Sequence, residues 1–95
     1  MGYSPLQRKE LIESRLRQAL SPTQLVVIDE SHLHLGHEGA KSGASHFALT
    51  IVSPAFIELP SVKRHQLIYS TLKDLIPSEI HALKITAKTP EESQL

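Results

Sequence analysis

A chain of 95 residues with ten basic and ten acidic side chains has zero formal net charge, so nothing draws it as a whole towards nucleic acid or an anionic membrane. The length allows one domain with a modest core, and no apolar run approaches the ~20 residues that span a bilayer. The absence of Cys excludes disulfides, a thiol nucleophile and a metal site built from the chain's own thiolates.

The first predicted element is a helix that begins at Ser4-Pro5 and ends before Ser21-Pro22. Ser is a favoured N-cap and Pro is tolerated at the first helical position, whereas the residue before a Pro is pushed out of the helical region. Between these signals the apolar residues recur at helical spacing: Leu6, Leu11, Ile12, Leu16, Ala19 and Leu20. The charged residues at the remaining positions are expected to face solvent.

Two strands are predicted next, Gln24–Ser31 and Ser45–Ser53, joined by the stretch Asp29–Phe47. About a dozen residues separate the strands, whereas most hairpin loops have about 2–5. The stretch holds four of the six histidines, which are His32, His34, His37 and His46. Neutral imidazole is a common metal ligand, so the loop is a candidate metal-binding segment; the alternative is a solvated loop whose histidines have no role. We expect Leu33–Gly43 to be mobile in the free protein.

A second helix is predicted over Pro60–Ile76 and a third strand over His81–Ala87. The helix carries an apolar stripe of helical period. In the strand, His81 shares with Leu83 and Ile85 the face that is expected to meet the core. Thr89–Leu95 is a polar tail that we expect to fray, with residues 91–95 flexible.

The predicted order is α-β-β-α-β, an α+β sandwich with two helices on one face of a three-stranded mixed sheet. We expect residues 1–95 to form one domain, with an ordered core over about residues 4–90. The first two strands should pair antiparallel, and a helical crossover should return the third strand parallel to the second. The third strand then starts at the end of the sheet that carries the loop. His81 should therefore lie near His34, His37 and His46.

These histidines are the strongest candidates for a site. Zinc and iron sites need several oriented ligands, so a loop without Cys offers a half-site that a partner's thiolates would complete. Two His ligands on one iron of a [2Fe–2S] cluster have precedent in Rieske centres. For His81, a ligand and a buried structural residue fit the pattern equally well. For His46 and His65 the structural role is favoured.

Other chemistry has weaker support in the sequence. Lys63, Arg64 and His65 open the second helix, where they would be placed to contact nucleic-acid phosphate, but with zero net charge a solvated helical turn is favoured. The chain shows no paired nucleophile and base, and no His with an evident acid partner. We therefore expect no enzyme activity.

Several segments together resemble the BolA-like protein family, over roughly Leu11 to Pro90. They are Asp29-Glu30-Ser31, Ser45-His46-Phe47, Phe56, Arg64-His65-Gln66-Leu67-Ile68-Tyr69, His81-Ala82-Leu83 and Lys88-Thr89-Pro90. The resemblance implies a fold related to class II KH domains, in agreement with the predicted order of elements.

The resemblance also implies partnership with monothiol, CGFS-type glutaredoxins. Family members form heterodimers with them that share a [2Fe–2S] cluster, and they act in iron–sulfur cluster trafficking and iron regulation. The glutaredoxin supplies its active-site Cys and a bound glutathione thiolate, and the BolA-like protein supplies His. The family's C-terminal ligand falls on His81 and its loop ligand on His34, with His37 as the alternative. No cofactor is expected in the isolated protein, and a homodimer of the free chain is left open.

The family is also described as DNA-binding transcription regulators of stress response and cell shape that act through the second helix. This chain has Gln66 where the usual Arg-His-Arg run has its second Arg, which removes one basic group. The sequence thus predicts a cluster-binding interaction module, with a DNA-binding regulator as the alternative. We expect a cytoplasmic protein without membrane contact.

Overall fold

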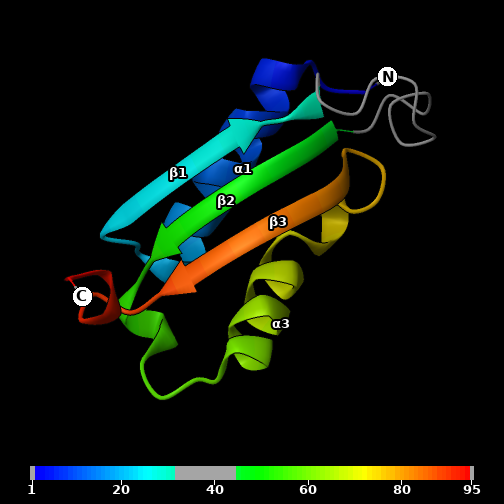
Figure 1. Ribbon diagram of the computed structural model, residues 1–95. Helices are drawn as coiled ribbons and strands as arrows, with labels where there is room; N and C mark the ends of the chain where they lie inside the picture. The colour runs from blue at the N-terminus through cyan, green and yellow to red at the C-terminus, as the bar shows by residue number, and fades with distance from the viewer. Residues whose placement is uncertain (1, 32–44, 95) are drawn as a thin grey trace.

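The computed structural model describes residues 2–31 and 45–94. Within them two helices and three strands follow one another in the predicted order (Figure 1). The elements are α1 (Pro5–Leu20), β1 (Gln24–Asp29), β2 (Ser45–Val52), α3 (Ser61–Thr71) and β3 (Ile80–Lys88), with 3-10 turns η2 (Pro54–Phe56), η3 (Lys73–Leu75) and η4 (Glu92–Gln94). The predicted α+β fold is confirmed. Neither helix in the described ranges has the length and apolar character needed to cross a bilayer.

Helix α1 keeps both of its predicted ends. The Gln7 amide donates to Ser4 Oγ (3.1 Å) and the Ser4 amide donates to the Gln7 side chain (2.9 Å), which satisfies two donors that a helix start leaves free. After the last turn Ser21 adopts the left-handed conformation with φ 45°, and its amide donates to the Arg17 carbonyl at 3.2 Å. These caps are local, which is why the sequence around them sufficed.

Helix α3 ends at Thr71, earlier than the predicted Ile76, and the chain continues as the tighter turn η3. The Leu72 amide is shared between the carbonyls three and four residues earlier, so the last turn changes from α to 3-10 geometry. This change brings both Leu72 and Leu75 into the core, where they are 0% and 3% exposed. Apolar spacing alone does not distinguish such an ending from a continuing helix.

Strand β2 is the centre of the sheet, antiparallel to β1 and parallel to β3, as predicted. The crossover through α3 returns the chain to the end of the sheet where β2 begins and β1 ends (Figure 1). One irregularity interrupts the parallel pairing. Ser45 lies opposite Ile80, but His46 lies opposite Ala82, so His81 is an extra residue in β3.

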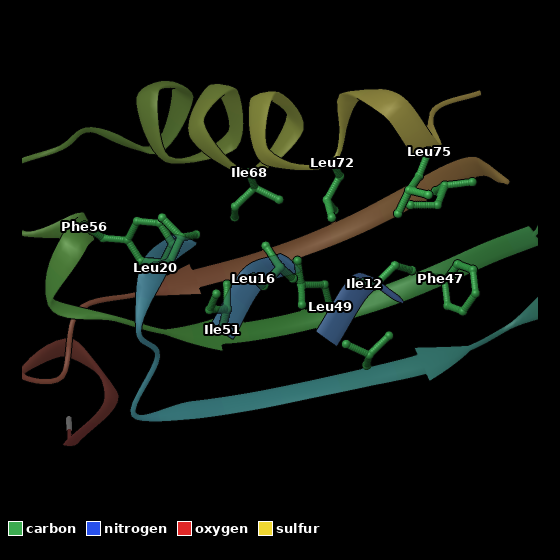
Figure 2. Close-up of a cluster of buried hydrophobic side chains, with 12 residues drawn as sticks. Ile12, Leu16, Leu20, Phe47, Leu49, Ile51, Phe56, Ile68, Leu72 and Leu75 are labelled. Carbon is green, nitrogen blue, oxygen red and sulfur yellow. The ribbon is translucent and has the colours of Figure 1, made fainter. Parts of the chain in front are cut away.

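The core lies between one face of the sheet and both helices (Figure 2). Phe47, Leu49 and Ile51 alternate along β2 towards the helices and are at most 2% exposed. They meet side chains from the helices and turns, among them Ile12, Leu16, Leu20, Phe56, Ile68 and Leu72. Each such buried side chain contributes roughly 1.5–3 kcal/mol, so this layer holds the strands in place. The other face carries exposed Val26 and Ile28.

The C-terminal segment departs from the expected frayed tail. Both carboxylate oxygens of Glu92 accept from the Arg64 guanidinium, at 2.6 and 3.0 Å, and Oε1 also accepts from the Thr89 amide at 2.8 Å. Thr89 itself is 8% exposed. The segment up to Gln94 is thus folded against α3 through a charge pair that the local polarity of the tail does not reveal.

Candidate functional site

Two histidines meet at the end of the sheet where β2 and β3 begin. The ring centroids of His46 and His81 lie 5.2 Å apart, and the ring planes are inclined by 55°. This proximity was predicted, and it follows from the parallel pairing of the two strands. The other two predicted neighbours, His34 and His37, lie outside the described residues, as does the expected mobility of Leu33–Gly43.

His81 does not lie on the core face of β3, and the prediction that it does was wrong. The strand begins one residue earlier, at Ile80, whose side chain is 1% exposed. The bulge then leaves both His81 and Ala82 exposed before alternation resumes at Leu83. Simple alternation would place His81 on the same face as Leu83. The one-residue insertion breaks this alternation, because it reverses the face of every residue before it. The observed exposure removes the alternative of a buried core residue and leaves the imidazole accessible.

His46 is only 9% exposed, although it lies on the face of β2 opposite Phe47. Its backbone amide and carbonyl are both hydrogen-bonded to the two residues that follow β1. The His46 carbonyl accepts from the Glu30 amide at 2.7 Å, and the His46 amide donates to Ser31 Oγ at 3.1 Å. The backbone of His46 therefore has little freedom to move.

A second group of bonds fixes the turn before His81. Arg8 Nε donates to Glu79 Oε1 at 2.9 Å and Arg8 Nη1 donates to Ser45 Oγ at 2.8 Å. The Ser45 amide donates to the Glu79 carbonyl at 3.2 Å. Hydrogen bonding from the Arg8 guanidinium lowers the pKa of the Glu79 carboxyl, which favours its ionised form. Helix α1 thereby anchors the starts of β2 and β3 to each other.

A small pocket of about 110 Å³ lies beside His46. Its walls are Glu30, His46, Phe47, Ala82, Leu83 and Lys84. Lys84 Nζ lies 3.1 Å from Glu30 Oε1, an ion pair that joins β3 to the end of β1. Pockets for organic ligands measure roughly 300–1,000 Å³, so this one suits at most a few waters or a small ion.

The basic residues of α3 are placed differently from one another. Lys63 is exposed and His65 is half-buried. Arg64 donates to the carbonyls of Leu59 (2.7 Å) and Ala87 (3.0 Å) as well as to Glu92, so four of its five N–H groups have protein acceptors. Hydrogen bonding to the Glu92 carboxylate raises the pKa of Arg64. Arg64 is therefore a structural tie, which argues against its predicted role as a phosphate contact.

A larger cavity of about 570 Å³, which no pattern in the sequence predicts, opens around Arg64 and Glu92. It is lined by Ile57, Glu58, Arg64, Thr89, Pro90, Glu91 and Glu92. The lining includes three acidic residues and one guanidinium that is already paired with Glu92, so the cavity is a poor site for a phosphate. It forms from segments that are far apart in sequence, and no local motif marks it.

Within residues 2–31 and 45–94, no three His, Cys, Asp or Glu side chains gather in a way that would hold a metal ion. Comparison with known proteins then identifies the family. Residues 16–92 match the sequence profile described as BolA-like protein. The chain belongs to this family. The resemblance predicted from the sequence is thus confirmed.

Individual relatives of known sequence or structure agree with this family assignment. The BolA domain of SufE1 from Arabidopsis thaliana is 44% identical and superposes with a TM-score of 0.82, over 96% of this chain and 99% of that one. SufE-like protein 1, chloroplastic/mitochondrial, from the same plant is 45% identical over 85% of this chain. Protein BOLA1, chloroplastic, also from Arabidopsis thaliana, is 39% identical over 90% of this chain. The DNA-binding transcriptional regulator BolA of Escherichia coli is 38% identical over 88% of this chain and 77% of its own length.

The two plant relatives are much longer than this BolA-like chain. It spans 23% of SufE-like protein 1 and 56% of BOLA1. The functions of those whole proteins are therefore only proposed for this chain.

Proposed function

We propose that this BolA-like protein is an interaction module that shares a [2Fe–2S] cluster with a monothiol glutaredoxin, in cluster trafficking or iron regulation. The observation that carries the proposal is the exposed imidazole of His81, on a backbone held by the bulge and by the Arg8–Glu79 pair. A chain with no Cys offers imidazole rather than thiolate, so the glutaredoxin Cys and its glutathione would supply the sulfur ligands.

His81 is the proposed ligand from the folded part of the chain, and His34, or alternatively His37, is the proposed ligand from the loop. Imidazole nitrogen is a suitable ligand for iron, and a cluster held by two His and two thiolates has precedent in Rieske centres. Because hydrogen bonds hold Glu79 before His81, and sheet pairing with His46 holds Ala82 after it, this ligand needs little reorganisation to bind. When bound, the cluster would supply the bridge that joins the two proteins.

The test mixes the purified chain anaerobically with a monothiol glutaredoxin, glutathione, ferrous iron and sulfide. We expect a heterodimer on size-exclusion chromatography with light scattering. Its visible absorption and circular dichroism should differ from those of the cluster that the glutaredoxin binds alone. The His65→Ala variant is the matched control, since it removes an imidazole from α3 and should behave like the unsubstituted chain. A chain that neither co-elutes with the glutaredoxin nor changes its spectrum would contradict the proposal.

A second candidate function is DNA-binding regulation of stress response and cell morphology. The name of the Escherichia coli relative favours it, and Lys63 is exposed on the first turn of α3. The neutral charge and the engaged donors of Arg64 argue against it. Phosphate contacts make DNA affinity fall steeply with salt, so anisotropy with a labelled duplex at several salt concentrations tests it, with Lys63→Ala as the variant.

Two further expectations belong to the proposal. We propose a cytoplasmic location, because a chain without Cys needs no oxidising compartment; the plant relatives are named chloroplastic/mitochondrial and chloroplastic. The same chromatography run on the free chain decides between a monomer and a homodimer.

A further inference from the structure

We propose that His46 is a positioning residue for His81, and that its ring sets the orientation in which the His81 imidazole is presented at this end of the sheet. The inference rests on the proposed function only for what His81 binds, because the ring contact belongs to the free protein. The sequence predicted that His46 lies near His81 and favoured a structural role for His46, but it assigned His46 no effect on the orientation of His81.

Hydrogen bonds and sheet pairing hold the backbones of both residues. His46 is held by the Glu30 amide and by Ser31 Oγ, at 2.7 and 3.1 Å. Two residues before His81, the Glu79 carbonyl accepts from the Ser45 amide and the Glu79 side chain accepts from Arg8, while Ala82, directly after His81, pairs with His46 in the sheet. The freedom that remains to His81 is rotation of its own side chain about two bonds.

An exposed imidazole on a fixed backbone can still adopt several staggered rotamers. A neighbouring ring limits them. The observed centroid distance of 5.2 Å falls within the range of about 4.5–7 Å that aromatic pairs prefer, and the 55° between the ring planes makes this a tilted pair. The two rings therefore stabilise one arrangement of His81 over the others.

The His46 ring is itself almost completely buried. It is 9% exposed and forms a wall of the small pocket, together with Glu30, Ala82 and Lys84. The Glu30–Lys84 ion pair, at 3.1 Å, joins two of the residues that line this pocket. The exposed ring of His81 thus lies beside a buried ring whose backbone is held by hydrogen bonds.

A ligand that is already oriented loses less conformational entropy on binding, and residues that orient metal ligands commonly affect metal binding by roughly 10–100-fold. Removal of the His46 ring should therefore leave the His81 ligand present but free to rotate. The complex with glutaredoxin should still form, and a chelator should remove its iron roughly tenfold faster.

Three variants separate positioning from other roles. His46→Ala removes the ring, His46→Phe keeps an aromatic ring without nitrogen, and Thr50→Ala changes another residue on the same face of β2 as a control. We expect faster iron loss and altered circular dichroism for His46→Ala only. Two results would overturn the proposal: His46→Ala behaving like the unsubstituted chain, or His46→Phe failing as badly as His46→Ala. The second result would make a nitrogen of His46 essential and the residue a ligand or a hydrogen-bond partner.

NMR of the free protein supplies a readout that needs no cluster. We expect contacts between the ring protons of residues 46 and 81 and one dominant His81 rotamer in the unsubstituted chain and in His46→Phe, and averaged rotamers in His46→Ala. Averaged rotamers in the unsubstituted chain would overturn the inference, even if His46→Ala did not fold. If no variant forms a cluster with glutaredoxin, the proposed function fails, while the NMR result still decides whether His46 positions His81.

Discussion

Single residues of the same type have different surroundings in this fold. His81 is exposed and His46 is buried, although they lie side by side on adjacent strands, while His65 is half-buried on α3. The difference between the first two comes from the extra residue in β3. Burial and neighbours, rather than residue type, therefore leave the imidazole of His81 accessible and that of His46 covered.

Replacement of His81 by Ala should abolish or strongly weaken the shared cluster, because no other described residue offers an exposed imidazole at this position. The side chain is exposed, so the free energy of unfolding should change by less than about 1 kcal/mol. Iron content of the glutaredoxin complex and urea unfolding of the free chain check the two expectations. An intact cluster with an unaltered spectrum would show that His81 is not a ligand.

At the scale of elements, Arg64 joins α3 to β3 and to the C-terminal turn. Its side chain is 13% exposed and also lies over the Phe56 ring, with 5.9 Å from Cζ to the ring centroid. The turn η4 depends on this side chain, since Glu92 accepts two of its hydrogen bonds.

The Arg64→Ala variant should lower the free energy of unfolding by about 2–3 kcal/mol, because it leaves the carbonyls of Leu59 and Ala87 without their charged donor. Lys63→Ala, one residue earlier and exposed, should change it by no more than about 0.5 kcal/mol. Chemical denaturation of both variants tests this. Equal stabilities would mean that the Arg64 contacts contribute little.

The same pair predicts a pH dependence. Hydrogen bonding from Arg64, and then from the Thr89 amide, lowers the pKa of Glu92 from 4.5 to about 2. The folded state binds this proton more weakly, so the stabilisation is complete above pH 4.5 and is lost as the pH falls towards about 2. Glu92→Gln should therefore be less stable than the unsubstituted chain at neutral pH, with a difference that shrinks through this window. Urea unfolding over the same pH range measures this difference in the free energy of unfolding, and a difference that stays constant with pH would contradict the prediction.

For the molecule as a whole, stability depends on the layer between the sheet and the helices (Figure 2). Leu16 is 0% exposed at the centre of that layer. Its replacement by Ala should lower the free energy of unfolding by about 2–5 kcal/mol, a large part of the roughly 5–15 kcal/mol typical of a small domain.

The matched control for the core is Ile28→Ala on the opposite face of the sheet, where the side chain is 52% exposed. It should cost less than about 1 kcal/mol. Thermal unfolding of the two variants measures the contrast. Similar losses would mean that the open face of the sheet is covered in solution.

The sequence by itself determined the order of the elements, the ends of α1, the sheet topology and the meeting of His46 with His81. Helix caps, apolar spacing and crossover length depend on neighbours along the chain, so the residues that produce them can be recognised locally. The family resemblance also came from the sequence, through segments spread along its length.

Only the tertiary structure decided which way His81 faces, where α3 ends and whether the tail is folded. The bulge depends on how β3 aligns with β2, and one inserted residue reverses the face that alternation predicts. The ties from Arg8 to Glu79 and from Arg64 to Glu92 join residues far apart in sequence. Such contacts depend on the packed arrangement of several elements, and for this reason neither the orientation of His81 nor the folding of the tail could be derived from local pattern.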